Sequence, residues 1–168
     1  GVETGVQYAR LLKVAYNKVK EANPEAKVVG FAQAGVSNSF MDYMAQEDPN
    51  IFTYMDLASF HEYCKGKPPE NSTYTGIVTY CAEKLHNRCG QNMDIWLTEM
   101  GLSENEIGIT EKEAAQYGVR SVLWNDAEKL YKNIFYYTWI NESGAEGYRE
   151  ANFGLLNQDY SAKKGYVA

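Results

Sequence analysis

The chain has 168 residues, a formal net charge of −6, 45% hydrophobic residues and 23% charged residues, so it is composed like a folded protein rather than a disordered one. The acidic balance argues against a nucleic-acid partner, because phosphate binding needs clustered Lys and Arg. No stretch approaches the roughly 20 apolar residues that cross a membrane, and a complete (β/α)8 barrel takes about 250 residues, so the chain is too short to be one.

Helical and strand-like segments alternate along the first half of the chain. Apolar side chains at helical spacing between Tyr8 and Val19 predict an amphipathic helix, which ends at Asn23-Pro24. A short buried strand is predicted over 27–32 and a short helix over 40–45.

The second half continues the alternation. Strands are predicted over 55–63, 95–101 and 134–140, and a helix over 77–85. Thr110 and Glu113 have the spacing of a capping box, which starts another helix. The apolar face of that helix is predicted to hold four side chains: Ala115, Val119, Val122 and Leu123. Beyond 140 we expect mostly loop, with a last helix starting at the C-terminus.

The predicted order is therefore a helix, three strand–helix units and a final strand. Apolar strands separated by helices pair in parallel and are covered by those helices. The chain shows no repeat, low-complexity segment or linker. We therefore predict an α/β fold, a parallel (βα) half-barrel that forms a single domain over residues 1–168.

Glu99 is the sharpest candidate for a catalytic residue. It ends the apolar segment Ile95-Trp96-Leu97-Thr98, and a carboxylate at that point is costly to desolvate unless something holds it. Active sites of α/β sheets and barrels lie at the carboxyl ends of the strands. Gly101 would let the chain turn just beyond Glu99. A strand-end Glu paired with Lys or Arg is the structural alternative.

Three further side chains are candidates for binding. His61 and Tyr63 end the preceding strand, and their spacing of two places them on one face, where they can donate to a carboxylate or to a sugar hydroxyl. The alternative for His61 is a bond to the backbone. The indole of Trp139, near the end of the last strand, can form the floor of a sugar subsite or pack in the core. Glu62 alternates away toward the helices, where a salt bridge is expected.

The sequence carries no motif for a cofactor or a metal. It has no phosphate-binding glycine loop, no HExxH and no nucleophilic serine motif, so neither a cofactor nor a metal site is expected. Cys64, Cys81 and Cys89 are an odd number and lack zinc spacing. One disulfide with a free thiol fits the sequence, and three buried thiols are favoured.

In this order the segments resemble the large clan of retaining (β/α)8 glycoside hydrolases that includes many cellulases, mannanases and xylosidases. Residues 8–29 are similar to helix four and strand five of that barrel, 56–63 to strand six with its His-x-Tyr ending, and 96–101 to strand seven. Residues 134–139 are similar to strand eight, and 152–163 to the clan's closing segment. The resemblance covers almost the whole chain and implies strands five to eight of a TIM-type barrel.

The resemblance implies a secreted, retaining hydrolase of β-linked poly- or oligosaccharides. Glu99 would be the nucleophile, His61 and Tyr63 would position it or the sugar, and Trp139 would line the subsite beside the scissile bond. A non-catalytic carbohydrate-binding or self-associating half-barrel module is the alternative function.

One residue of the clan has no counterpart in the matching segments. The clan's acid/base Glu stands in an Asn-Glu motif at the end of strand four, and the resemblance of this chain begins after that strand. Asn105-Glu106 and Asn141-Glu142 follow loop-like positions instead. A retaining mechanism needs two carboxyl groups about 5–5.5 Å apart, so the isolated chain is expected to be weak or inactive. A four-stranded half-barrel also leaves two open edges, and we expect a second copy or an N-terminal half-barrel to cover them.

Overall fold

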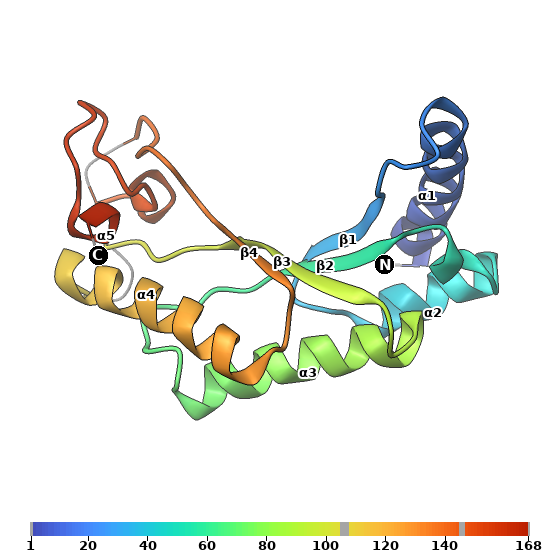
Figure 1. Ribbon diagram of the computed structural model, residues 1–168, viewed down its shortest axis with the longest axis horizontal. Coiled ribbons are helices and arrows are strands. Elements are labelled where there is room, and N and C mark those ends of the chain that lie inside the picture. The colour runs from blue at the N-terminus through green and yellow to red at the C-terminus, as the bar shows by residue number, and fades with distance from the viewer. Residues whose placement is uncertain (1, 105–107, 145–146, 168) are drawn as a thin grey trace.

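The computed structural model describes residues 2–104, 108–144 and 147–167, which contain one four-stranded sheet with helices (Figure 1). The elements alternate as the sequence predicts, so the α/β fold class is confirmed. In chain order they are α1 (Val2–Ala22), β1 (Val29–Ala34), α2 (Asn38–Glu47), η1 (Ile51–Thr53), β2 (Leu57–His61), α3 (Ser72–Cys89), β3 (Asp94–Met100), α4 (Glu111–Glu128), β4 (Asn133–Tyr136), η2 (Arg149–Asn152) and α5 (Lys164–Val167).

The sheet has the strand order β1-β2-β3-β4, and every neighbouring pair is parallel. Sequential parallel strands joined by helices are the arrangement of half a (β/α)8 barrel. The register between β2 and β3 shifts just before His61, which then lies opposite Glu99. The pairing of the sheet therefore brings these two predicted site residues to the same edge.

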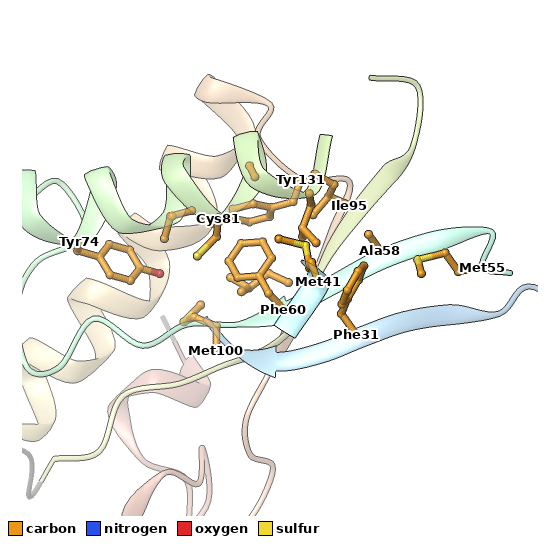
Figure 2. Close-up of a cluster of buried hydrophobic side chains, with 14 of the residues drawn as sticks. Phe31, Met41, Met55, Ala58, Phe60, Tyr74, Cys81, Ile95, Met100 and Tyr131 are labelled. Atoms are coloured by element: carbon orange, nitrogen blue, oxygen red, sulfur yellow. The ribbon is translucent and has the colours of Figure 1, made fainter. Parts of the chain in front are cut away.

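The hydrophobic core lies on one face of the sheet, along which α2, α3 and α4 run (Figure 1). Phe60 of β2 is fully buried among side chains that include Met41, Cys81 and Ile95 (Figure 2). The opposite face is less covered: the ring of Phe135 is 47% exposed and packs on Trp96 with 5.5 Å between centroids.

Helix α3 begins at Ser72, five residues before the predicted start. The first turn has the sequence Ser-Thr-Tyr-Thr-Gly, which has weak helix propensity. The turn forms because the side chain of Asn71 accepts a hydrogen bond from the Thr73 N–H at 3.0 Å.

The capping box of α4 at Thr110 and Glu113 is confirmed, and so is the burial of Ala115, but the rest of the predicted apolar face is wrong. Val119, Val122 and Leu123 are exposed. The helix instead buries small side chains at helical spacing: Ala114, Ala115, Gly118 and Ser121. Small residues allow the helix to approach its neighbours closely. The prediction relied on large apolar side chains, and therefore did not find the buried face of α4.

Strand β4 ends at Tyr136, four residues earlier than predicted. Beyond it the chain pairs with the closing segment. The Thr138 N–H donates to the Phe153 carbonyl at 3.2 Å, and the Leu156 N–H donates to the Trp139 carbonyl at 2.9 Å. The closing segment thus supplies the backbone partners that a longer β4 would have taken from β3.

None of the three cysteines forms a disulfide, so the disulfide alternative is wrong. Cys64 and Cys81 are buried, and Cys89 is partly exposed. Burial raises the pKa of Cys81 to about 11 and that of Cys89 to about 12. Among the described helices, none is both long and apolar enough to cross a membrane.

Candidate active site

Glu99 stands at the carboxyl end of β3 with both of its carboxylate oxygens engaged. The Tyr63 hydroxyl donates a hydrogen bond to Oε1, and His61 Nδ1 lies 3.3 Å from Oε2. The side chain is 31% exposed, so it remains accessible. Within the described part of the chain, no Lys or Arg forms an ion pair with Glu99. The arrangement is a carboxylate held by a phenol and an imidazole, rather than a strand-end ion pair.

Tyr63 packs against a buried aromatic ring. Its ring meets that of Phe153 edge-on with 5.3 Å between centroids, and Phe153 is almost fully buried. Burial first, and then the hydrogen bond to Glu99, raise the pKa of the Tyr63 phenol well above its ordinary value. Tyr63 therefore keeps its proton and acts as a donor to Glu99.

A second Tyr–Glu pair stands on the same Phe153 ring. Tyr137, the first residue after β4, meets that ring with 5.7 Å between centroids, and its hydroxyl donates to Glu142 Oε1 at 2.8 Å. The hydrogen bond to Glu142 and burial, followed by the charges of Glu142, Glu99 and Glu150, raise the pKa of Tyr137 to about 12. Tyr137 therefore lies within electrostatic reach of Glu99.

Arg149 of η2 brings a positive charge to this aromatic group. Its guanidinium lies 5.9 Å from the centroid of Tyr63 and 5.3 Å from that of Phe153, distances at which a cation is attracted to a ring face. Its Nη1 is 3.3 Å from Glu150 Oε1. Residues 149–153 thus supply a cation, a carboxylate and the Phe153 ring beside the Tyr63–Glu99 pair.

Trp139 occupies a different environment from the other predicted site residues. It follows the end of β4 by three residues, is 58% exposed, and packs edge-on against Tyr166 of α5 with 5.5 Å between centroids. The structure therefore brings Glu99, His61 and Tyr63 together, whereas the aromatic residue found near Glu99 after β4 is Tyr137. A substrate-binding role for Trp139 stays a prediction.

Glu62 points away from the site, as predicted, but the expected salt bridge is absent from the described residues. The residue is 7% exposed, and its charge contributes to the raised pKa of Cys81 in α3, which places Glu62 on the helix side of the sheet. Burial raises the pKa of its carboxyl, against the smaller lowering effects of Lys65 and of the Tyr63 N–H. Glu62 is therefore a buried acid without a direct cationic partner in this part of the chain.

Gly101 serves close packing rather than a turn. A Cβ at this position would lie 2.1 Å from the carbonyl oxygen of Tyr137, far inside van der Waals contact. Only glycine lets the backbone after β3 approach the backbone after β4 this closely. The close contact places Gly101, two residues after Glu99, directly against the backbone of Tyr137.

Three residues of this group were not predicted from the sequence: Tyr137, Arg149 and Phe153. For Glu142 the sequence left open whether it reaches a substrate or caps the loop. Phe153 lies in residues 152–163, which carry part of the resemblance, and this is the signal in the sequence that points to it. No group of three or more His, Cys, Asp or Glu side chains among the described residues is placed to hold a metal ion.

No protein-family model matches the chain, and no curated protein matches its sequence. Solved structures do match. A family 39 glycoside hydrolase from Bacteroides cellulosilyticus WH2 superposes with a TM-score of 0.78 and 23% identity, over 95% of this chain and 35% of that one. A monomeric β-xylosidase from Caulobacter crescentus CB15 gives 0.70 and 18%, over 95% and 36%. A β-glucuronidase from Ruminococcus gnavus gives 0.53 and 12%, over 75% and 28%.

These likenesses define the fold. The four parallel strands and their helices match part of a glycoside hydrolase barrel, as a half-barrel does. The chain spans about a third of the length of the first matching structures.

Proposed function

We propose that this chain is the C-terminal half of a retaining β-glycosidase barrel and that Glu99 is its nucleophile. The observation that carries the proposal is the Glu99 carboxylate, held by Tyr63 and His61 at the carboxyl end of β3 and still accessible. The likeness to enzymes described as β-xylosidases supports a neutral β-linked glycoside as substrate.

In the proposed reaction, a Glu99 oxygen forms a bond to the anomeric carbon. The glycosidic bond breaks, and its electron pair goes to the leaving oxygen, which takes a proton from a second carboxyl group. Water, deprotonated by that same group, then displaces Glu99 and restores the original configuration at the anomeric carbon. Tyr63 and His61 fix the carboxylate in the orientation that this attack requires.

The second carboxyl group is proposed to come from a complementary half-barrel. Glu142 accepts from Tyr137, and Glu150 contacts Arg149; Asn105-Glu106 lies outside the described residues. Strands β1 and β4 are the two edges of the sheet, and the exposed Phe135 marks its open face. An N-terminal half-barrel or a second copy of this chain would pair with both edges and bring an acid opposite Glu99.

The test compares the 168-residue chain with the full gene product that contains it, using aryl β-xylosides and β-glucosides. We expect the full product to release the sugar with retained anomeric configuration, seen by NMR, and Glu99→Gln to abolish this. Sugar release that survives Glu99→Gln, or inversion at the anomeric carbon, would reject the proposal. Oligosaccharide binding without turnover, unchanged in Glu99→Gln, would identify a carbohydrate-binding module instead.

A further inference from the structure

The Tyr63 ring has two neighbours besides the carboxylate to which its hydroxyl donates. It packs edge-on against Phe153, and its hydroxyl donates to Glu99 Oε1. The guanidinium carbon of Arg149 lies 5.9 Å from the centroid of Tyr63 and 5.3 Å from that of Phe153. A cation within about 6 Å of a ring face is attracted to that ring. Phe153 and Arg149 together therefore restrain the ring whose hydroxyl holds Glu99.

Arg149 is itself anchored to the segment that follows β3. Its carbonyl accepts a hydrogen bond from Ser103 Oγ at 2.9 Å, and Ser103 is fully buried. Ser103 follows Glu99 by four residues. At the other end of the residue, Arg149 Nη1 lies 3.3 Å from Glu150 Oε1. Contacts on the backbone and on the side chain thus place the guanidinium beside the Tyr63 ring.

The hydrogen bond between Tyr63 and Glu99 depends on the orientation of that ring. A phenol side chain can rotate about its torsions, and a hydrogen bond weakens steeply when its angle closes. The Glu99 side chain is 31% exposed, so water can compete for its oxygens when the hydroxyl turns away. A carboxylate that attacks a carbon atom must keep a narrow range of orientations. A contact that holds the Tyr63 ring therefore affects the attacking group.

Building on the proposed glycosidase function, we propose that Arg149 is a positioning residue for the reaction. It holds the Tyr63 ring in the orientation in which the hydroxyl donates to Glu99, and it acts through Tyr63 rather than on the sugar. The contribution of Arg149 to the rate then requires the Tyr63 hydroxyl. A contribution of Arg149 to stability alone would not require it.

The test begins with kcat/KM of the full gene product on 4-nitrophenyl β-xyloside, which measures the barrier from free enzyme and substrate to the transition state. Arg149→Met keeps a long unbranched side chain and removes the charge. We expect kcat/KM to fall about 2- to 30-fold, the range for losing a cation–ring contact that is partly exposed to solvent.

The decisive measurement combines Arg149→Met with Tyr63→Phe, which keeps the ring and removes the hydroxyl. In the Tyr63→Phe background, Arg149→Met should change kcat/KM by less than about 2-fold, because no hydroxyl is left to orient. Urea midpoints are measured beside the kinetics. Arg149→Met should lower stability to the same extent in both backgrounds, because the contact with the ring is present in both.

Arg120 in α4 offers a matched control. Its guanidinium carbon lies 5.6 Å from the centroid of Tyr117, and its Nε lies 2.7 Å from Glu70 Oε1. It therefore combines a tyrosine ring and a glutamate, as Arg149 does, with partners other than the Tyr63–Glu99 pair. Arg120→Met should leave kcat/KM unchanged in both backgrounds.

The failure of this inference differs from the failure of the proposed function. Equal losses from Arg149→Met with and without the Tyr63 hydroxyl, or Glu99-dependent turnover that Arg149→Met leaves unchanged, overturn the inference alone. Turnover that survives Glu99→Gln removes the proposed function, and absence of turnover in the full gene product overturns both.

Discussion

The hydroxyl of Tyr63 is the single atom on which the geometry of Glu99 depends most directly. Tyr63→Phe keeps the ring contact with Phe153 but removes the donor to Glu99 Oε1. We expect the Glu99-dependent rate of the full gene product to fall about 10- to 150-fold, the range for a hydrogen bond to a charged group. Urea denaturation is the control, and an unchanged rate at unchanged stability would contradict this role for Tyr63.

Glu62 makes the stability of the chain depend on pH. Because its pKa is raised in the folded state, the stability linked to its proton is present below the ordinary carboxyl pKa and is lost as the pH rises through the raised value. Glu62→Gln removes that loss. The stability of Glu62→Gln relative to the wild type should therefore increase as the pH rises from about 4 toward neutrality.

Urea midpoints at several pH values measure this difference directly, and the exposed Glu25→Gln is a matched control that should show little trend. A difference between Glu62→Gln and the wild type that stays constant with pH would mean that Glu62 titrates normally in the folded chain.

Single site residues could be predicted from the sequence where the period-two alternation of a strand decides to which face a side chain points. Glu99, His61 and Tyr63 meet because strand ends and period-two alternation place them on one edge. Arg149 could not be found in this way, and for Glu142 the sequence left open whether it reaches a substrate or caps the loop. Their positions depend on how the chain after β4 folds so that Tyr137 and Arg149 both meet the Phe153 ring, and no local pattern predicts that path.

At the scale of elements, the backbone after β3 and the backbone after β4 pack at Gly101. Gly101→Ala would place a methyl group 2.1 Å from the Tyr137 carbonyl oxygen. We expect it to destabilise the chain by about 1–3 kcal/mol, as overpacking does. Gly76→Ala, in α3 where a Cβ meets nothing within 4 Å, should instead add about 0.5–1 kcal/mol. Equal midpoints for both variants in urea would contradict the close approach.

Element order and type followed from the sequence, whereas several boundaries and one face did not. Helix α3 starts early because Asn71 caps it, and β4 ends early because the closing segment takes over its hydrogen bonds. The buried face of α4 consists of small residues. A local cap therefore sets the start of α3 and a distant segment sets the end of β4, and the hydrophobic pattern predicts neither boundary.

At the scale of the whole molecule, the half-barrel exposes apolar surface that a partner would cover. Phe135 on the open face and Val122 and Leu123 on α4 are all exposed, and the outer strands β1 and β4 have free edges. We expect the isolated 168-residue chain to self-associate at micromolar concentration in sedimentation experiments, and Phe135→Ser to weaken this association. A monomeric isolated chain would contradict the expected need for a partner.

The central claim is that Glu99 attacks an anomeric carbon, and trapping its covalent adduct tests this most directly. A dinitrophenyl 2-deoxy-2-fluoro-β-xyloside suits the purpose, because dinitrophenolate departs with the electron pair of the broken bond and needs no proton from an acid. After reaction with the full gene product, mass spectrometry of the digested protein should find the fluorosugar on Glu99, and none should be found in Glu99→Gln. A sugar attached to any other residue, or no adduct at all, would contradict the account.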